Sequence, residues 1–127
     1  MPHSKYKRIT IALAVLIVLL VALCGKLFWD YSLLDIRTEL AREQIEIFDH
    51  MRDQALKSGV AEAADCLRYA VHYYPSGTKQ VAGSRLDRIV ERERDEAVRA
   101  IIASLRTKTG EDVGDDPEKW VEKYGKK

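Results

Sequence analysis

The sequence predicts an all-α protein in which one N-terminal transmembrane helix continues into a small extracytoplasmic helical bundle. Three observations indicate this class. An apolar run without charge covers residues 9–25, and apolar residues at helical spacing follow over residues 30–58. The remaining residues, 59–127, form short helix-spaced apolar segments that Gly and Pro separate.

The first element is the apolar run from Ile9 to Gly25, in which fifteen of seventeen residues are apolar. Seventeen helical residues span roughly 25 Å, slightly less than the ~30 Å hydrocarbon core of a bilayer. Extension through Trp29 closes this gap, because Lys26 can reach the phosphate layer and an indole suits the interface. We therefore expect a transmembrane helix over residues 9–29, with membrane lipid as its partner.

The orientation follows from the basic residues beside the run. Lys5, Lys7 and Arg8 precede it without any acidic residue. Because basic residues favour the cytoplasmic side, residues 1–8 are predicted to be a cytoplasmic tail and the rest of the chain to be extracytoplasmic. The expected location is the cell (inner) membrane, crossed once.

A cleaved signal peptide has the same N-terminal pattern of basic and then apolar residues. The cleavage site is poor, since Ala22-Leu23-Cys24 only approximates A-x-A, and Leu23 also fits lipoprotein processing at Cys24 badly. An uncleaved anchor is therefore preferred. The alternative is a secreted soluble helical protein.

The second element, residues 30–58, is predicted to be an amphipathic juxtamembrane helix. No Gly or Pro follows Gly25 until Ser58-Gly59, so it is expected to continue the membrane helix without a break and to end at Gly59 in a positive φ. Gln44 interrupts its apolar face. The residues predicted to carry contact, either within the chain or with a partner, are Leu33, Ile36, Leu40, Ile47, Phe48 and Met51.

The third and fourth elements make up most of the helical domain predicted over residues 59–127. A helix is expected over 60–74, broken by Pro75-Ser76-Gly77. Ser84 and Asp87 have capping-box spacing, which predicts that each side chain caps the other's backbone N–H at the start of the next segment. That segment is either one helix to about Lys108 or two helices that turn near Arg94-Asp95.

The last element begins at Asp116, which is expected to cap a short helix that starts with Pro117 and runs through Tyr124.

Residues 95–105 and the tail after them resemble the C-terminal end of bacterial HEAT-repeat proteins. The tail pattern T-G-x-D-x-G-x-D-P-x-x-W is matched by Thr109, Gly110, Asp112, Gly114, Asp116, Pro117 and Trp120. This resemblance implies protein–protein contact or scaffolding and supplies no catalytic residues. Only one repeat is visible, whereas a solenoid needs about three.

Charge divides unevenly along the outer part of the chain. Lys and Arg minus Asp and Glu gives 4 − 9 = −5 over residues 30–65, 9 − 5 = +4 over 66–108 and 4 − 6 = −2 over 109–127. Such asymmetry either steers helices together or reflects ordinary solvated faces. Basic residues alternate with acids, so a nucleic-acid partner is not expected.

No pattern in the sequence indicates catalysis. His3, His50 and His72 lie far apart, Cys66 and His72 are poorly aligned for zinc, and the acidic tail lacks EF-hand spacing. We predict no catalytic, cofactor or metal site, no evident small-molecule substrate, and a protein that is not an enzyme. Cys66 is interpreted as a buried thiol, with an intermolecular disulfide as the alternative. Tyr69, Tyr73 and Tyr74 form either a packing edge or a binding face.

The function expected from these features is a single-pass membrane-anchored scaffold or interaction subunit without catalysis, which binds a protein partner or itself. One alternative is a coiled-coil assembly subunit of a membrane complex, similar in layout to bitopic cell-division proteins. The other is the secreted soluble helical protein.

Overall fold

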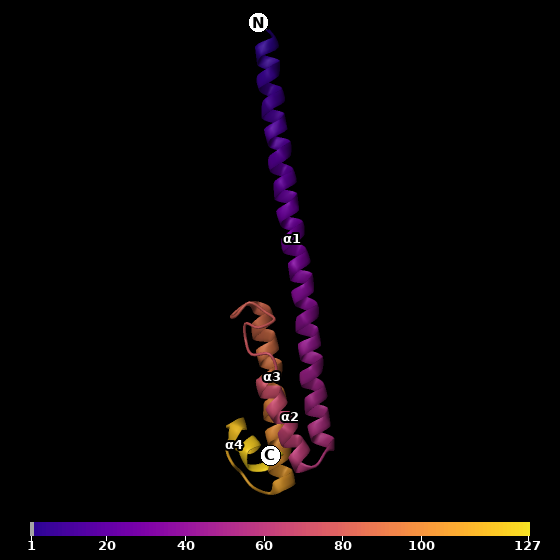
Figure 1. The fold of residues 1–127 in the computed structure, drawn as a ribbon, viewed down its shortest axis with the longest axis vertical. Helices are drawn as coiled ribbons and strands as arrows, with labels where there is room; N and C mark the ends of the chain where they lie inside the picture. The colour runs from indigo at the N-terminus through magenta and orange to yellow at the C-terminus, as the bar shows by residue number, and fades with distance from the viewer. Residues whose placement is uncertain (1) are drawn as a thin grey trace. The chain divides into compact units, whose positions relative to one another are not determined.

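A computed structural model describes residues 2–127, and over that range it contains four α-helices and no strand (Figure 1). The all-α class is therefore confirmed. The chain divides into two compact units, of which the first ends at Ile36 and the second covers Arg37–Lys127. The four helices are α1 (Pro2–Lys57), α2 (Val60–His72), α3 (Arg85–Thr109) and α4 (Pro117–Tyr124).

Helix α1 is unbroken from Pro2 to Lys57, including Gly25, as the lack of helix breakers predicts. Its C-terminal end differs from the expectation. Gly59 has φ −74° and ψ 175°, so it is the extended residue before α2 and not a left-handed helix cap. The Lys108 ammonium instead donates to the carbonyls of Ala55 and Ser58, at 2.5 and 2.6 Å. A cation thus satisfies carbonyls that the helix end leaves open.

The core of the second unit is built mainly by α2 and α3, which lie side by side, while α4 packs against α2 (Figure 1). Full burial of one large apolar side chain contributes ~1.5–3 kcal/mol, so the six largest buried residues are a main source of stability. These six residues are Trp120, Phe48, Leu67, Ile101, Leu105 and Val90.

The part of α1 within the second unit contributes one stripe to this core, formed by Ala41, Gln44, Phe48 and Ala55. These residues are spaced by three, four and seven, which keeps them on one helical face. Gln44 is only 2 % exposed, so it lies within the buried face and does not interrupt it. Two of the four, Ala41 and Ala55, are small, which lets the neighbouring helices approach α1 closely at those positions.

Helix α3 runs through Arg94 and Asp95 without a turn, which decides between the one-helix and two-helix interpretations. The reason is that Arg94 is not part of a solvated charged run: its side chain is buried, with Glu91 as an ion-pair partner. Its guanidinium also lies 5.0 Å from the ring centre of Phe48 on α1. The apolar face of α3 therefore continues through this residue.

The same guanidinium caps the C-terminal end of α2. It donates to the carbonyl of Ala70 at 3.1 Å and to the carbonyls of Tyr73 and Tyr74. These carbonyls have no later turn of helix to accept from, because α2 ends at His72. One buried cation therefore connects three helices and satisfies a helix end at once.

Replacing Arg94 should destabilise the second unit strongly. In Arg94→Met the stem volume remains but three carbonyls lose their donor, so we expect the free energy of unfolding to fall by about 2–4 kcal/mol. Urea unfolding in detergent, followed by circular dichroism, measures this. The matched control is Arg92→Met, two residues away and exposed, for which the change should stay within about 0.5 kcal/mol. Equal losses in both variants would contradict the capping role.

Candidate functional site

The largest apolar surface of the described chain lies on the first unit. An 18-residue window of α1 has a mean hydropathy of 2.8, and none of it is buried by other residues. Leu16, Leu19 and Phe28, for example, are 52, 61 and 73 % exposed. By length and composition this segment can cross a membrane, criteria that signal sequences and buried core helices also meet. Its exposure separates it from a helix buried in the core of this chain.

The six residues of the predicted interaction face do not share one environment. Ile36 is 57 % exposed on the first unit, and Leu33, also on that unit, is half-buried. Within the second unit, Phe48 is fully buried and Met51 packs against the core. Leu40 and Ile47 are half-buried beside the core stripe. Phe48 and Met51 are therefore used within the bundle, and Ile36 remains the most accessible member.

The tyrosines around the end of α2 form a packed cluster that is open on one side. The rings of Tyr69 and Tyr73 stack 5.1 Å apart, and Tyr74 meets Tyr73 edge-on at 4.4 Å. Tyr73 also contacts Phe48, so the packing-edge interpretation holds for it. Tyr69 and Tyr74 keep 46 and 40 % of their surface exposed.

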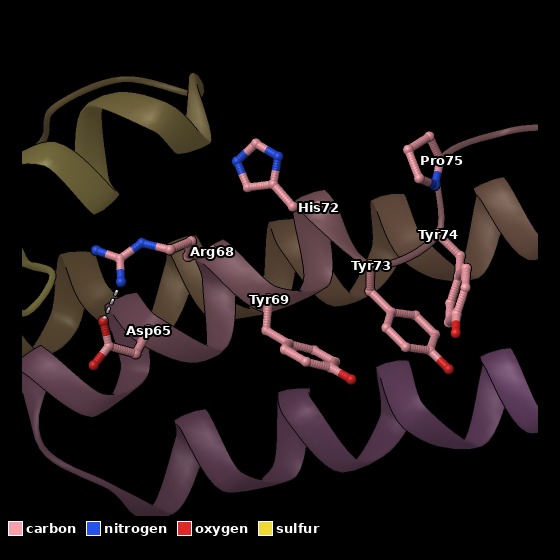
Figure 2. A pocket seen from close by; sticks show the side chains of 7 residues that line it. All are labelled: Asp65, Arg68, Tyr69, His72, Tyr73, Tyr74 and Pro75. Carbon is pink, nitrogen blue, oxygen red and sulfur yellow. Dashed lines mark hydrogen bonds and ion pairs between the residues drawn. The ribbon is translucent and has the colours of Figure 1, made fainter. Parts of the chain in front are cut away.

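An open pocket of about 770 Å³ adjoins this cluster. In Figure 2 the three tyrosine rings lie on one side of α2, while His72 and Pro75 lie on the opposite side. Arg68 pairs with Asp65 at 3.1 Å, and His72 lies 2.9 Å from Glu118 of α4. Arg68 and His72 thus have partners within the chain, and they do not converge on a common point with the tyrosine rings.

The C-terminal tail motif closes the end of α3. Gly110 adopts φ 69° as the left-handed cap of α3, a conformation that glycine adopts without strain. The Thr109 hydroxyl donates to the Leu105 carbonyl and accepts from the Glu111 amide. Asp116 accepts from the Glu118 amide and Pro117 begins α4, which confirms the predicted start of this helix.

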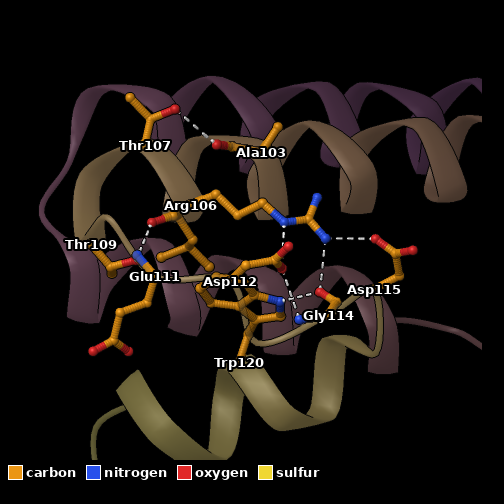
Figure 3. A network of polar contacts seen from close by, with 10 residues as sticks. Ala103, Arg106, Thr107, Thr109, Glu111, Asp112, Gly114, Asp115 and Trp120 are labelled. Carbon is orange, nitrogen blue, oxygen red and sulfur yellow. Dashed lines mark hydrogen bonds and ion pairs between the residues drawn. The ribbon is translucent and has the colours of Figure 1, made fainter.

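The rest of the motif converges on one carbonyl, that of Gly114, as Figure 3 shows. This oxygen accepts from the indole N–H of the fully buried Trp120 at 2.8 Å and from Arg106 at 3.0 Å. Asp112 accepts from the Gly114 amide and from Arg106, and these bonds hold the pKa of its carboxyl below the ordinary value. The motif residues thus build a turn and dock α4.

Cys66 is 5 % exposed on α2, in agreement with the buried-thiol interpretation. Burial raises the pKa of this thiol, and Glu62 and Asp65 add to the effect. The thiol therefore stays neutral and is poorly placed for a bond to a second chain. Among residues 2–127, no group of three His, Cys, Asp or Glu side chains is arranged to hold a metal ion.

The connection between α2 and α3 is organised by Asp87, a buried carboxylate 5 % exposed. It accepts from the Ser76 hydroxyl at 2.6 Å and from the amides of Gly83 and Gly77, at 2.9 and 3.4 Å. These bonds, led by that from Ser76, lower the pKa of Asp87. The predicted capping box is therefore only half formed. The Asp87 amide donates to the Ser84 hydroxyl. The Asp87 carboxylate, however, accepts from the loop residues and not from the Ser84 amide.

The same loop is fixed to α1 within the second unit. The amide nitrogen of the buried Gln80 side chain donates to the Arg37 carbonyl at 2.7 Å. Lys79 lies 4.1 Å from the ring centre of Tyr74. The contact of Gln80 could not be predicted from local sequence, because Arg37 lies on α1, 43 residues earlier.

Comparisons with known proteins give no relative: no family model, curated protein or solved structure matches the chain.

The charge of Asp87 should make the stability of the second unit depend on pH. Because its pKa is lower in the folded than in the unfolded chain, its contribution is complete above the unfolded value of about 4 and is lost as pH falls through the folded value. We expect Asp87→Asn to cost about 1–2 kcal/mol at pH 7.

Urea unfolding at a series of pH values tests this, and the difference between wild type and Asp87→Asn should shrink below about pH 4. The exposed Asp95→Asn on the same helix is the control and should show no such trend. A difference that is constant with pH would assign the effect of Asp87→Asn to shape and not to charge.

Proposed function

We propose that this chain is a single-pass membrane protein whose helical domain serves as a non-catalytic scaffold or interaction subunit. The observation that carries the proposal is the exposed apolar segment of α1, in a chain whose second unit closes its own core. An isolated apolar surface of this length in water would be costly, and a bilayer removes that cost.

The proposed topology places the N-terminal side in the cytoplasm and the second unit outside it. It rests on Lys5, Lys7 and Arg8, which precede the span without acidic neighbours. Alkaline phosphatase fused after Lys127 tests this in a bacterial host, because the enzyme is active only outside the cytoplasm. Activity from this fusion supports the topology, and an inactive but membrane-bound fusion reverses it.

Two charges within the apolar segment should release the protein from membranes. Its eleven Leu, Ile and Val residues favour insertion by about 3–7 kcal/mol in total, and each central Arg costs about 2.5–3.5 kcal/mol. Leu16→Arg with Leu19→Arg therefore offsets the whole gain. We expect the double variant to leave the alkali-resistant membrane fraction.

The control for this experiment places two Arg residues on exposed apolar positions of the second unit, Leu56→Arg with Val81→Arg. It should stay in the membrane fraction as wild type does. Wild-type protein that is itself extracted by alkali would contradict anchorage.

The scaffold part of the proposal rests on the exposed end of the predicted interaction face. Ile36 is accessible, and the HEAT-like tail resemblance implies protein contact. The part of α1 in the second unit already packs in its own bundle through Phe48, which favours contact at the first-unit end of the face. A coiled-coil assembly subunit would use the same surface for self-association.

A charge at this position should change association without changing folding. For Ile36→Glu we expect an unchanged melting temperature and a smaller particle in detergent, because a buried charge at an apolar contact costs several kcal/mol. Size-exclusion chromatography with light scattering measures this. Leu56→Glu, equally apolar and 48 % exposed, is the control that should leave the size unchanged. A wild-type protein that is strictly monomeric would exclude self-association at Ile36.

The intact mass of the native protein distinguishes the anchored protein from the secreted alternative. The retained mass of all 127 residues supports the anchor. A mature chain that begins near Gly25 would establish cleavage, and the second unit would then be a soluble helical domain.

A further inference from the structure

We propose that the loop between α2 and α3, together with the first turns of α3, is a membrane-surface contact that binds anionic lipid headgroups. This inference rests on the proposed membrane anchorage. It assigns a role to a basic surface that nothing in the core requires. The surface is defined here as the basic loop end and comprises Val81, Arg85, Arg88 and Arg92.

The first argument is charge. Arg85, Arg88 and Arg92 recur every three to four residues on α3, so they lie along one face. All three are exposed, and within residues 2–127 none of them forms an ion pair. Three unpaired guanidinium groups on one face match the phosphates of lipid headgroups.

The second argument is that three acids around the basic loop end, Asp87, Glu39 and Glu91, are already engaged. Asp87 is turned into the loop, where it accepts from Ser76, Gly77 and Gly83. Glu39 of α1 pairs with Arg42 at 2.7 Å. Glu91 pairs with the buried Arg94. Asp95 and Glu96, three and four residues after Arg92, form no ion pair with it among the described residues, so its guanidinium group is open to a partner outside the chain.

The third argument is an exposed apolar residue among these charges. Val81 is 52 % exposed at the loop, although the core of the second unit is otherwise well covered. An apolar tip flanked by cations is the composition of segments that dip into the headgroup layer. The loop that carries it is held in shape by Asp87 and by Gln80, so the tip does not need to order on binding.

The fourth argument is reach. Gln80 is hydrogen-bonded to the carbonyl of Arg37, which follows Trp29 by only eight residues. Eight residues span at most about 28 Å even when fully extended. If Trp29 lies at the interface, the chain itself holds Arg37, to which Gln80 is bonded, within this distance of the interface, whatever the angle between the two units. The opposite end of α3 lies about 33 Å away along the helix, because Thr107 follows Arg85 by 22 residues.

The test uses the full chain in lipid nanodiscs, with a fluorophore on Val81→Cys or on Thr107→Cys. Cys24 is replaced by Ala in both, and Cys66 is buried. Nitroxide-headgroup lipid quenches a probe that touches the surface. In discs of phosphatidylcholine and phosphatidylglycerol we expect strong quenching at position 81 and little at 107. Discs of phosphatidylcholine alone, or NaCl near 1 M, where the Debye length is about 3 Å, should remove the difference.

The decisive variant is Arg85→Gln with Arg88→Gln and Arg92→Gln. It should lower the equilibrium constant for contact between the loop and the lipid surface on the order of a hundredfold, roughly fivefold for each cation removed. The control removes the same charge elsewhere, in Lys57→Gln, Lys119→Gln and Lys127→Gln, and should quench as wild type does. Lys79 is kept in both, because it packs over Tyr74.

Two failures are distinguishable in this design. A chain that does not co-elute with the discs would overturn the anchor itself. A chain that co-elutes but shows equal quenching at positions 81 and 107, or quenching indifferent to phosphatidylglycerol, would overturn the lipid contact and leave the anchor intact.

Discussion

The buried guanidinium of Arg94 is the interaction on which the second unit depends. It reaches the carbonyls at the end of α2, the ring of Phe48 on α1 and the carboxylate of Glu91 on its own helix. A charge taken from water is costly unless every donor finds a partner, and here the end of a helix supplies several acceptors together. The arrangement fixes where α2 stops, and this fixes where the loop to α3 begins.

That loop shows how the constraint propagates. Tyr74, directly after the capped end, has φ 40°, which turns the chain away from the α2 axis. Asp87 at the start of α3 then accepts hydrogen bonds from the loop, and Gln80 of the loop donates one to α1. The bonds of Asp87 lie within 11 residues and that of Gln80 spans 43, so the loop is ordered both by its own polar groups and by its contact with α1. A surface loop held by buried polar groups is preorganised for contact.

The sequence predicted most of what depends on near neighbours. The cap at Asp116 and the unbroken α1 follow from local chemistry, and both are present. It did not predict the role of Arg94, because the backbone carbonyls that it caps lie 20 to 24 residues earlier. The helical spacing of Arg94 with the buried Val90 and Ile101 was the one sequence signal that this arginine faces the core. Likewise, helical periodicity marked Phe48 as apolar-facing, but periodicity does not say whether the partner of such a face is the same chain or another.

The second unit leaves little apolar surface for a partner. Its large exposed apolar side chains among the described residues are Leu56, Tyr69, Tyr74 and Val81, whereas those of the first unit run from Tyr6 to Ile36. The tail motif is likewise occupied, since its polar groups bond to one another around Gly114. The first unit therefore carries most of the apolar surface on which a contact driven by apolar burial would form, whereas the second unit exposes charged side chains. A bilayer presents both chemistries together, apolar chains below charged headgroups, and this pairing supports the membrane contacts proposed for the two units.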